Sequence, residues 1–119
     1  MAASGDVFPA SVQLDPGGAV YVGGFFSSTA TFLGTSRTSA GGTDVFVMNV
    51  SATNSLGWVH NFGNSAETYV ARIGLALGGG VILNFDNDGS GTVAVGSTTQ
   101  QMNDLDSMIA HIPSSGTLP

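Results

Sequence analysis

Cysteine is absent from this chain of 119 residues, so neither a disulfide framework nor a thiolate metal site can form. Lysine is absent too, and Arg37 and Arg72 are the only strong bases against eight acidic residues, which gives a formal net charge of −6. Phosphate groups are bound chiefly through lysine and arginine. The charge balance therefore argues against nucleic acid as a partner and against attraction to anionic lipid.

Long apolar runs and helical periodicity are also missing. The longest uncharged apolar stretch, residues 73–85, has 13 residues and includes three consecutive glycines, whereas a membrane-spanning helix needs about 20. The opening MAASGDVFPAS has neither the basic start nor the apolar centre of a signal peptide. No window spaces its apolar residues three and four apart, so we expect no membrane insertion and no helix beyond a brief turn at residues 101–105.

Charged residues make up only 8% of the chain and hydrophobic residues 42%, which excludes a solvated disordered polymer. What the chain has in abundance is glycine and short β-branched segments. Each segment is bounded by turn-forming residues, which is typical of strands. We expect strands at residues 12–14, 19–24, 29–32, 44–50, 56–62, 68–75, 81–85, 92–95 and 107–112.

Two long stretches of the sequence echo one another. VQLDPGGAVYVGGF at 12–25 is followed 61 residues later by IGLALGGGVILNFD, and DVFVMNV at 44–50 is followed 62 residues later by DSMIAHI. A difference of one residue between the two spacings is the size of a single loop insertion. We therefore expect two copies of one unit of about 60 residues, the first at 1–61 and the second at 62–119, with glycines that punctuate strands rather than bind phosphate.

The fragments VYVGGF, GGTDVFVMNV, GW and FGN resemble the β-propeller repeats of bacterial and archaeal surface proteins, in which an acidic-glycine turn precedes an aromatic strand. The resemblance covers residues 5–116. It implies four-stranded antiparallel blades and an extracellular or cell-surface location. The matching positions in the first copy are Asp15, Gly18, Tyr21, Gly24, Asp44, Phe46, Gly57 and Trp58. In the second copy the equivalents of Asp15, Tyr21 and Gly23-Gly24 are Ala76, Ile82 and Asn84-Phe85. The lysine of the family near the end of the third strand is replaced by Asn49 in the first copy and by His111 in the second.

The second copy ends at SSGTLP, where its counterpart of the strand at Trp58 would begin. One blade is therefore expected to lack its last strand. Two blades cannot close a ring, and each would expose an apolar face and an unpaired edge. We expect these faces to be covered by further copies in a ring or filament, or by the remainder of a larger β-propeller.

The loop DNDGSG carries oxygen donors at the alternate positions Asp86, Asp88 and Ser90, which suit a hard cation such as Ca²⁺. The position at which an EF-hand would place its glutamate is occupied by Ser97. An Asp-Gly turn between strands is the alternative reading, and it is favoured because the first copy has FFSSTA at the same place. No other cofactor is indicated.

Aromatic residues offer a second candidate site. Trp58 with Tyr21 and Tyr69 could form a platform on which sugars stack, because the faces of such rings are apolar and electron-rich. The alternative is packing between blades, which the position of Trp58 within the repeat favours.

Catalytic groups are scarce. His60 and His111 lie in predicted strands, and we expect each imidazole to make one hydrogen bond rather than to act in catalysis. Asp104 and Asp106 could form an acid/base pair, but we expect them to be solvated carboxylates. The sequence thus predicts a non-enzymatic extracellular module that assembles with itself or belongs to a larger propeller. The alternative is a lectin-like module that binds carbohydrate.

Overall fold

The computed structural model describes residues 6–65, 67–103 and 106–118, with the backbone alone at 67 and 69–71. Within that part of the chain every regular element is a β-strand, which confirms the all-β prediction. The strands are β1 (Val7–Leu14), β2 (Val20–Phe26), β3 (Thr29–Phe32), β4 (Thr35–Thr38), β5 (Asp44–Val50), β6 (Leu56–Phe62), β7 (Glu67–Leu75), β8 (Val81–Asp88), β9 (Gly91–Val95), β10 (Thr98–Met102) and β11 (Ser107–Ile112).

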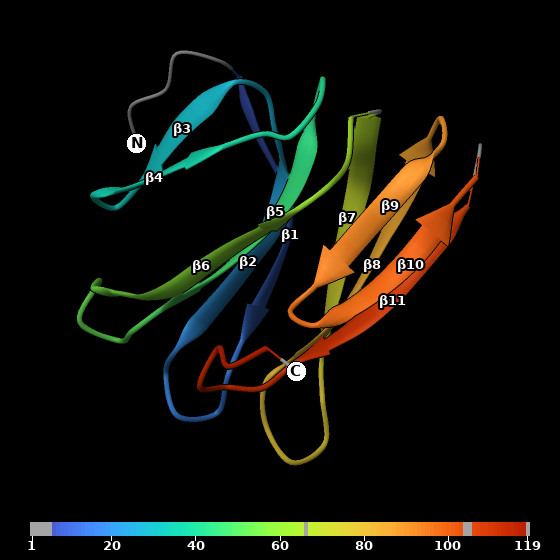
Figure 1. Ribbon diagram of the computed structural model, residues 1–119. Coiled ribbons are helices and arrows are strands. Elements are labelled where there is room, and N and C mark those ends of the chain that lie inside the picture. The colour runs from blue at the N-terminus through green and yellow to red at the C-terminus, as the bar shows by residue number, and fades with distance from the viewer. Residues whose placement is uncertain (1–5, 66, 104–105, 119) are drawn as a thin grey trace.

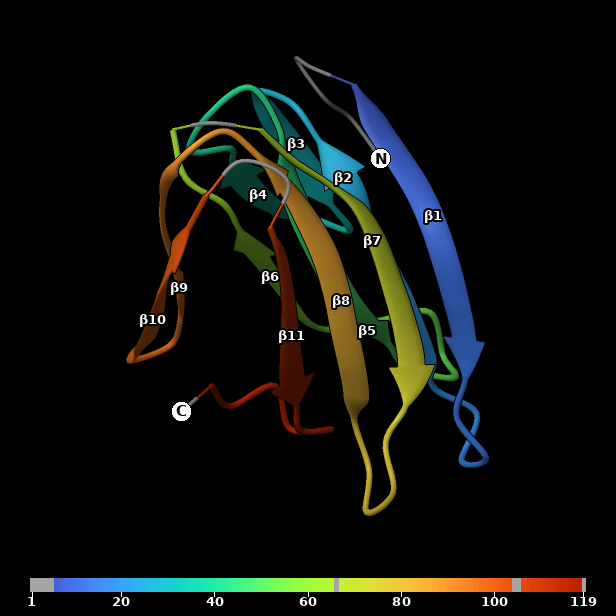
Figure 2. The same cartoon turned by 90° about the vertical axis from the view of Figure 1, so that its right-hand side faces the viewer.

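Only one of the two main sheets has the four strands expected of a blade, and no propeller-like arrangement of blades is shown. A first sheet has the order β1-β2-β5-β6, a second sheet has β7-β8-β11, and two hairpins, β3-β4 and β9-β10, stand apart from them. All pairs are antiparallel. Figure 1 shows the first sheet and the second sheet as two layers side by side, and Figure 2 shows β1 next to β7 where they meet.

Two strands were not expected from the sequence. β4 and β10 are polar, and the brief turn allowed at residues 101–105 is wrong at its start, because β10 extends to Met102. Each of these strands pairs with the strand before it through a two-residue connection. In the first connection Leu33 and Gly34 both have positive φ, 47° and 93°, as in the tight turns that suit the twist of a hairpin.

Strand pairing follows the same register in the two sheets. Val12 lies opposite Val22 in the first sheet, and Ile73 lies opposite Leu83 in the second, 61 residues later. Likewise Val50 pairs with Val20, and Ile112 pairs with Val81. Since directly paired residues share one face of a sheet, these rows define equivalent faces of the two sheets.

The sheets pack through unlike faces. From the first sheet, Tyr21, Val45, Val47 and Phe62 enter the larger apolar cluster. The second sheet contributes the following buried residues to that cluster: Ile73, Val81, Leu83, Phe85, Ala110 and Ile112. Gly23 makes close approach possible, because a Cβ at this position would lie 3.0 Å from Cγ2 of Ile73. Ser11 and Gln13 also donate hydrogen bonds to the backbone carbonyl of Ile73, at 3.5 and 3.1 Å.

A smaller cluster lies on the opposite side of the first sheet. The hairpin β3-β4 covers part of that side, where Ala30 and Phe32 of β3 pack against Phe26, Phe46 and Val59 of the sheet. The hairpin β9-β10 takes the matching place in the second half, since Val93, Val95 and Met102 join the larger cluster. The expected boundary between residues 61 and 62 falls at the end of β6, and the larger cluster draws on both halves of the chain.

Candidate functional site

Tyr21 and Trp58 are brought together, as the sugar-platform hypothesis requires. Both pair with Asn49, one from β2 and the other from β6, and their ring centroids are 6.1 Å apart with the planes tilted by 52°. Tyr21 is only 1% exposed, however, so its ring offers no face to a ligand in this structure. The side chain of Tyr69 lies outside the described residues.

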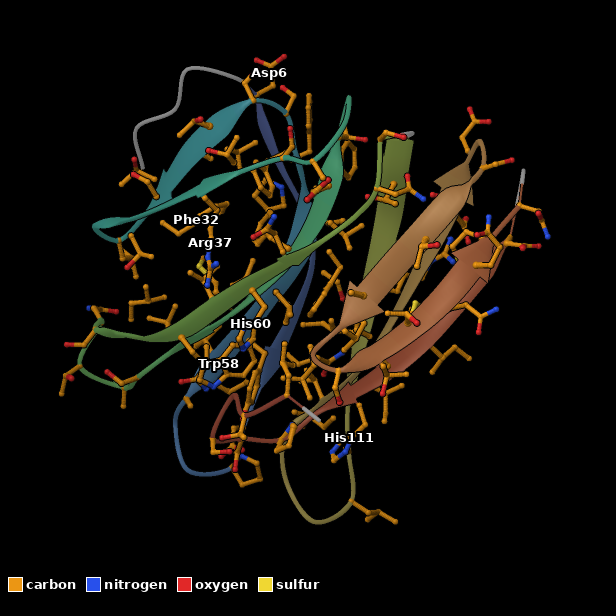
Figure 3. All side chains as sticks on the ribbon, in the orientation of Figure 1. Asp6, Phe32, Arg37, Trp58, His60 and His111 are labelled. Carbon is orange, nitrogen blue, oxygen red and sulfur yellow. The ribbon has the colours of Figure 1, made fainter. Side chains whose placement is uncertain are left out.

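The indole of Trp58 is engaged by the C-terminal segment of the chain. Its Nε1 donates a hydrogen bond to the carbonyl of Ser114 at 2.9 Å, and a Cβ at Gly116 would lie 2.5 Å from the ring. His60, next along the same face of β6, has Nε2 at 2.6 Å from the carbonyl of Gly116. Figure 3 shows both rings on β6 beside this segment. Trp58 and His60 thus hold residues 113–118 against the first sheet.

Burial raises the pKa of two groups near these elements. The pKa of Tyr21 is raised mainly by burial and further by the negative charge of Asp15, while a hydrogen bond with Asn49 opposes the shift. The pKa of Asp44 is raised by burial, against hydrogen bonds from Asn61 and from the backbone of Ala40 and Gly41. Asp44 begins β5 and is almost fully buried, so it fastens the preceding loop to β6.

The predicted cation loop is largely strand. Asp86 and Asp88 lie in β8, two positions apart on its outward side, and only Ser90 lies in the following turn. Asp86 accepts a hydrogen bond from Ser107 at 2.6 Å. An extended strand cannot wrap an ion as a flexible loop does, and no group of three or more histidine or carboxylate side chains gathers among the described residues. A calcium site therefore stays a prediction without support from the geometry.

The two histidines each contact a backbone carbonyl. His60 contacts Gly116 as described, and Nε2 of His111 lies 3.3 Å from the carbonyl of Gly79. Asp104 lies outside the described residues, and Asp106 accepts a hydrogen bond from the backbone of Asn103 through its side chain. These contacts are structural in kind, and none of them pairs a nucleophile with a base.

A cavity of about 730 Å³ lies between the hairpin β3-β4 and the free edge of β6. Its polar lining includes Thr35, Arg37, Asn54 and Ser55, and Trp58 contributes to its apolar wall. Arg37 was not predicted as a site residue. The one available signal was that it is one of only two strong bases in an acidic chain.

A second cavity, of about 580 Å³, lies along the free edge of β11. Its lining is mostly apolar and includes Val95, Met108, Ala110 and Leu118. In the first sheet the strand equivalent to β11 is β5, and its corresponding edge is paired with β6. The second cavity therefore occupies the place that a fourth strand would fill.

Comparison of the chain with protein-family models, with curated proteins and with solved structures finds no match. A search of the described residues for a helix of sufficient length and apolarity to cross a membrane also finds none.

Proposed function

We propose that this chain is a non-enzymatic interaction module whose two blade-like units assemble with further copies by stacking sheet on sheet. Such stacking builds the ring of a β-propeller or, where the rotation between units does not close, a filament. An extracellular or cell-surface location is part of the same proposal, because the sequence resembles the repeats of surface proteins.

The main support for the proposal is that equivalent faces of the two sheets are buried to very different extents. Ile73 is 6% exposed because it packs against the first sheet, whereas its equivalent Val12 is 62% exposed. Val81 and Leu83 are fully buried, whereas their equivalents Val20 and Val22 are only half-buried. We call this less covered surface the outer face of the first sheet, formed by Val12, Leu14, Val20, Val22, Met48 and Val50.

The second sheet likewise exposes a face whose equivalent in the first sheet is buried. Val47 is fully buried between the sheets, but its equivalent in the second sheet, Ile109, is 71% exposed. Tyr21 is buried, while its equivalent Ile82 is 39% exposed. We call the surface that carries Ile82, Asn84 and Ile109 the outer face of the second sheet. If the contact between the two sheets of one chain is repeated between chains, the outer face of the second sheet of one chain packs on the outer face of the first sheet of the next chain.

Contacts of this kind are heterologous, since they join two different surfaces. Each copy then offers one surface of each type, and association continues until a ring closes. The free edge of β11 and its apolar cavity support the same proposal, because an added strand would complete the second sheet as β6 completes the first.

The proposal is tested by sedimentation of variants that place a charge on the outer face of the first sheet. Val12 is already 62% exposed, so Val12→Asp should leave the fold intact while burying an unpaired carboxylate in the assembly. That cost of several kcal/mol should weaken association by about 100-fold or more.

Leu77→Asp is the matched control, because Leu77 lies in the loop between β7 and β8 with its side chain fully exposed. The wild-type chain and the Leu77→Asp variant should sediment as the same oligomer and Val12→Asp as a monomer. A wild-type chain that is folded and monomeric at micromolar concentration would overturn the proposal.

A further inference from the structure

The cavity between β3-β4 and β6 differs in charge from the rest of the molecule. The chain has a net charge of −6, yet none of the described residues lining this cavity is acidic, and one of them is Arg37. Its volume of about 730 Å³ lies within the range of small-molecule sites. A locally positive, polar cavity on an acidic protein is suited to an anionic ligand.

Arg37 is anchored at this cavity by one hydrogen bond to the neighbouring strand. Its Nη2 donates to the carbonyl of Val59 on β6 at 2.7 Å, which fixes the guanidinium across the gap between β4 and β6 (Figure 3). Its Nε is buried and has no hydrogen-bond partner among the described residues, and no carboxylate is among the residues that line the cavity. A half-buried charge is costly, and an anion bound at the Nη groups would offset that cost, although the buried Nε itself is out of a ligand's reach.

The remaining lining indicates which kind of anion fits. Asn54, Ser55 and Thr35 provide amide and hydroxyl groups that can bond to sugar hydroxyls, and Leu33 and Trp58 provide apolar walls. We propose that this cavity binds an acidic sugar residue, with the guanidinium of Arg37 on the carboxylate. The guanidinium fork is suited to this role because it can donate two parallel hydrogen bonds to a carboxylate.

This inference goes beyond the assembly proposal and can fail independently of it. The cavity lies at the hairpin and the edge of β6, where its lining residues Leu56 and Val59 pair with Val50 and Met48 of the outer face. Val12 lies on β1, at the opposite edge of the same sheet. A monomeric variant such as Val12→Asp should therefore bind the sugar as the wild-type chain does.

The direct test is an NMR titration of the wild-type chain with glucuronate, with glucose and with sodium sulfate as three separate probes. Glucuronate should shift the backbone amides of Thr35, Asn54 and Ser55, and glucose should shift them only at concentrations at least about tenfold higher. Sulfate binding as tightly as glucuronate would remove the sugar from the proposal. Absence of shifts at these amides with every probe would overturn it entirely.

Two substitutions that each remove one positive charge distinguish a specific contact of Arg37 with the ligand from a general effect of net charge. Arg37→Gln should weaken glucuronate binding by about tenfold or more, because a charge-assisted hydrogen bond is lost. Arg72→Gln is the control, since Arg72 is exposed on β7 and the change in net charge is the same. Equal losses in the two variants would overturn the assignment. Should Arg37→Gln fail to fold, Arg37→Lys keeps the charge but not the fork, and undiminished binding by that variant would exclude a bidentate contact.

Discussion

The contact between Gly23 of β2 and Ile73 of β7 is the point at which the packing of the two sheets can be measured most sharply. Ile73 is 6% exposed, so truncating it to alanine should destabilise the protein by about 2–5 kcal/mol. A methyl group added by Gly23→Ala would lie 3.0 Å from Cγ2 of Ile73, which is too close without a local shift. That crowding should cost about 1–3 kcal/mol, partly offset by about 0.5–1 kcal/mol because alanine is favoured over glycine within a strand.

The two substitutions together should cost clearly less than the sum of the two separately. In the Ile73→Ala background the new methyl group enters vacated space, so Gly23→Ala should become stabilising there, with a coupling energy of about 1–3 kcal/mol. Urea unfolding followed by the fluorescence of the single tryptophan, Trp58, at one fixed protein concentration measures all four proteins.

Gly74→Ala provides the matched glycine control, because a Cβ at that position would meet nothing within 4 Å. Its coupling to Ile73→Ala should be near zero. A coupling energy below about 0.3 kcal/mol for the Gly23 and Ile73 pair would refute the reasoning, because residues that do not touch are additive within that margin.

Two further predictions concern groups held by the first sheet. Because burial raises the folded-state pKa of Asp44, the folded state binds its proton more readily than the unfolded state, so this group should make stability increase as pH falls from above the folded pKa toward about 4. Asp44→Asn should flatten that rise in urea titrations, and an unchanged slope would contradict the assignment. Gly116→Ala should displace the C-terminal segment from Trp58, because a Cβ would lie 2.5 Å from the ring and φ is 78°. The tryptophan emission should then shift to the red, and an unchanged spectrum would show that the segment does not cover the ring.

Much of the fold was predictable because hydrophobic alternation alone sets the long strands. β3, β5, β6 and β11 have the bounds expected from the sequence, and β2, β7, β8 and β9 differ from expectation by one to three residues at their ends. β1 was expected only at residues 12–14 and begins five residues earlier, at Val7. β4 and β10 were missed because TSRT and TTQQM lack an apolar stripe. Their pairing with β3 and β9 depends on the tight connections before them, and a leucine with positive φ at position 33 is a poor sequence signal for such a turn.

The candidate sites were less predictable, because they depend on register and on packing between strands distant in sequence. The proximity of Tyr21 to Trp58 follows only once both are paired with Asn49, and the burial of Tyr21 follows only once the second sheet is in place. The environment of Arg37 is set by a hairpin that was not expected and by a carbonyl 22 residues away. Neither arrangement can be predicted from the residues adjacent in sequence.

Cross-linking through introduced cysteines tests the stacking of sheets between chains most directly. The chain is suited to it because it has no cysteine of its own. Ile73 packs on Gly23 within the chain, and the equivalents of these residues at a spacing of 61 are Val12 and Asn84, on the outer faces of the first and second sheets. Val12→Cys and Asn84→Cys proteins, mixed under mild oxidation, should therefore form a disulfide between the two variants in preference to links within either one. Links that form mainly between two Val12→Cys chains, or no preference at all, would contradict head-to-tail stacking of the sheets.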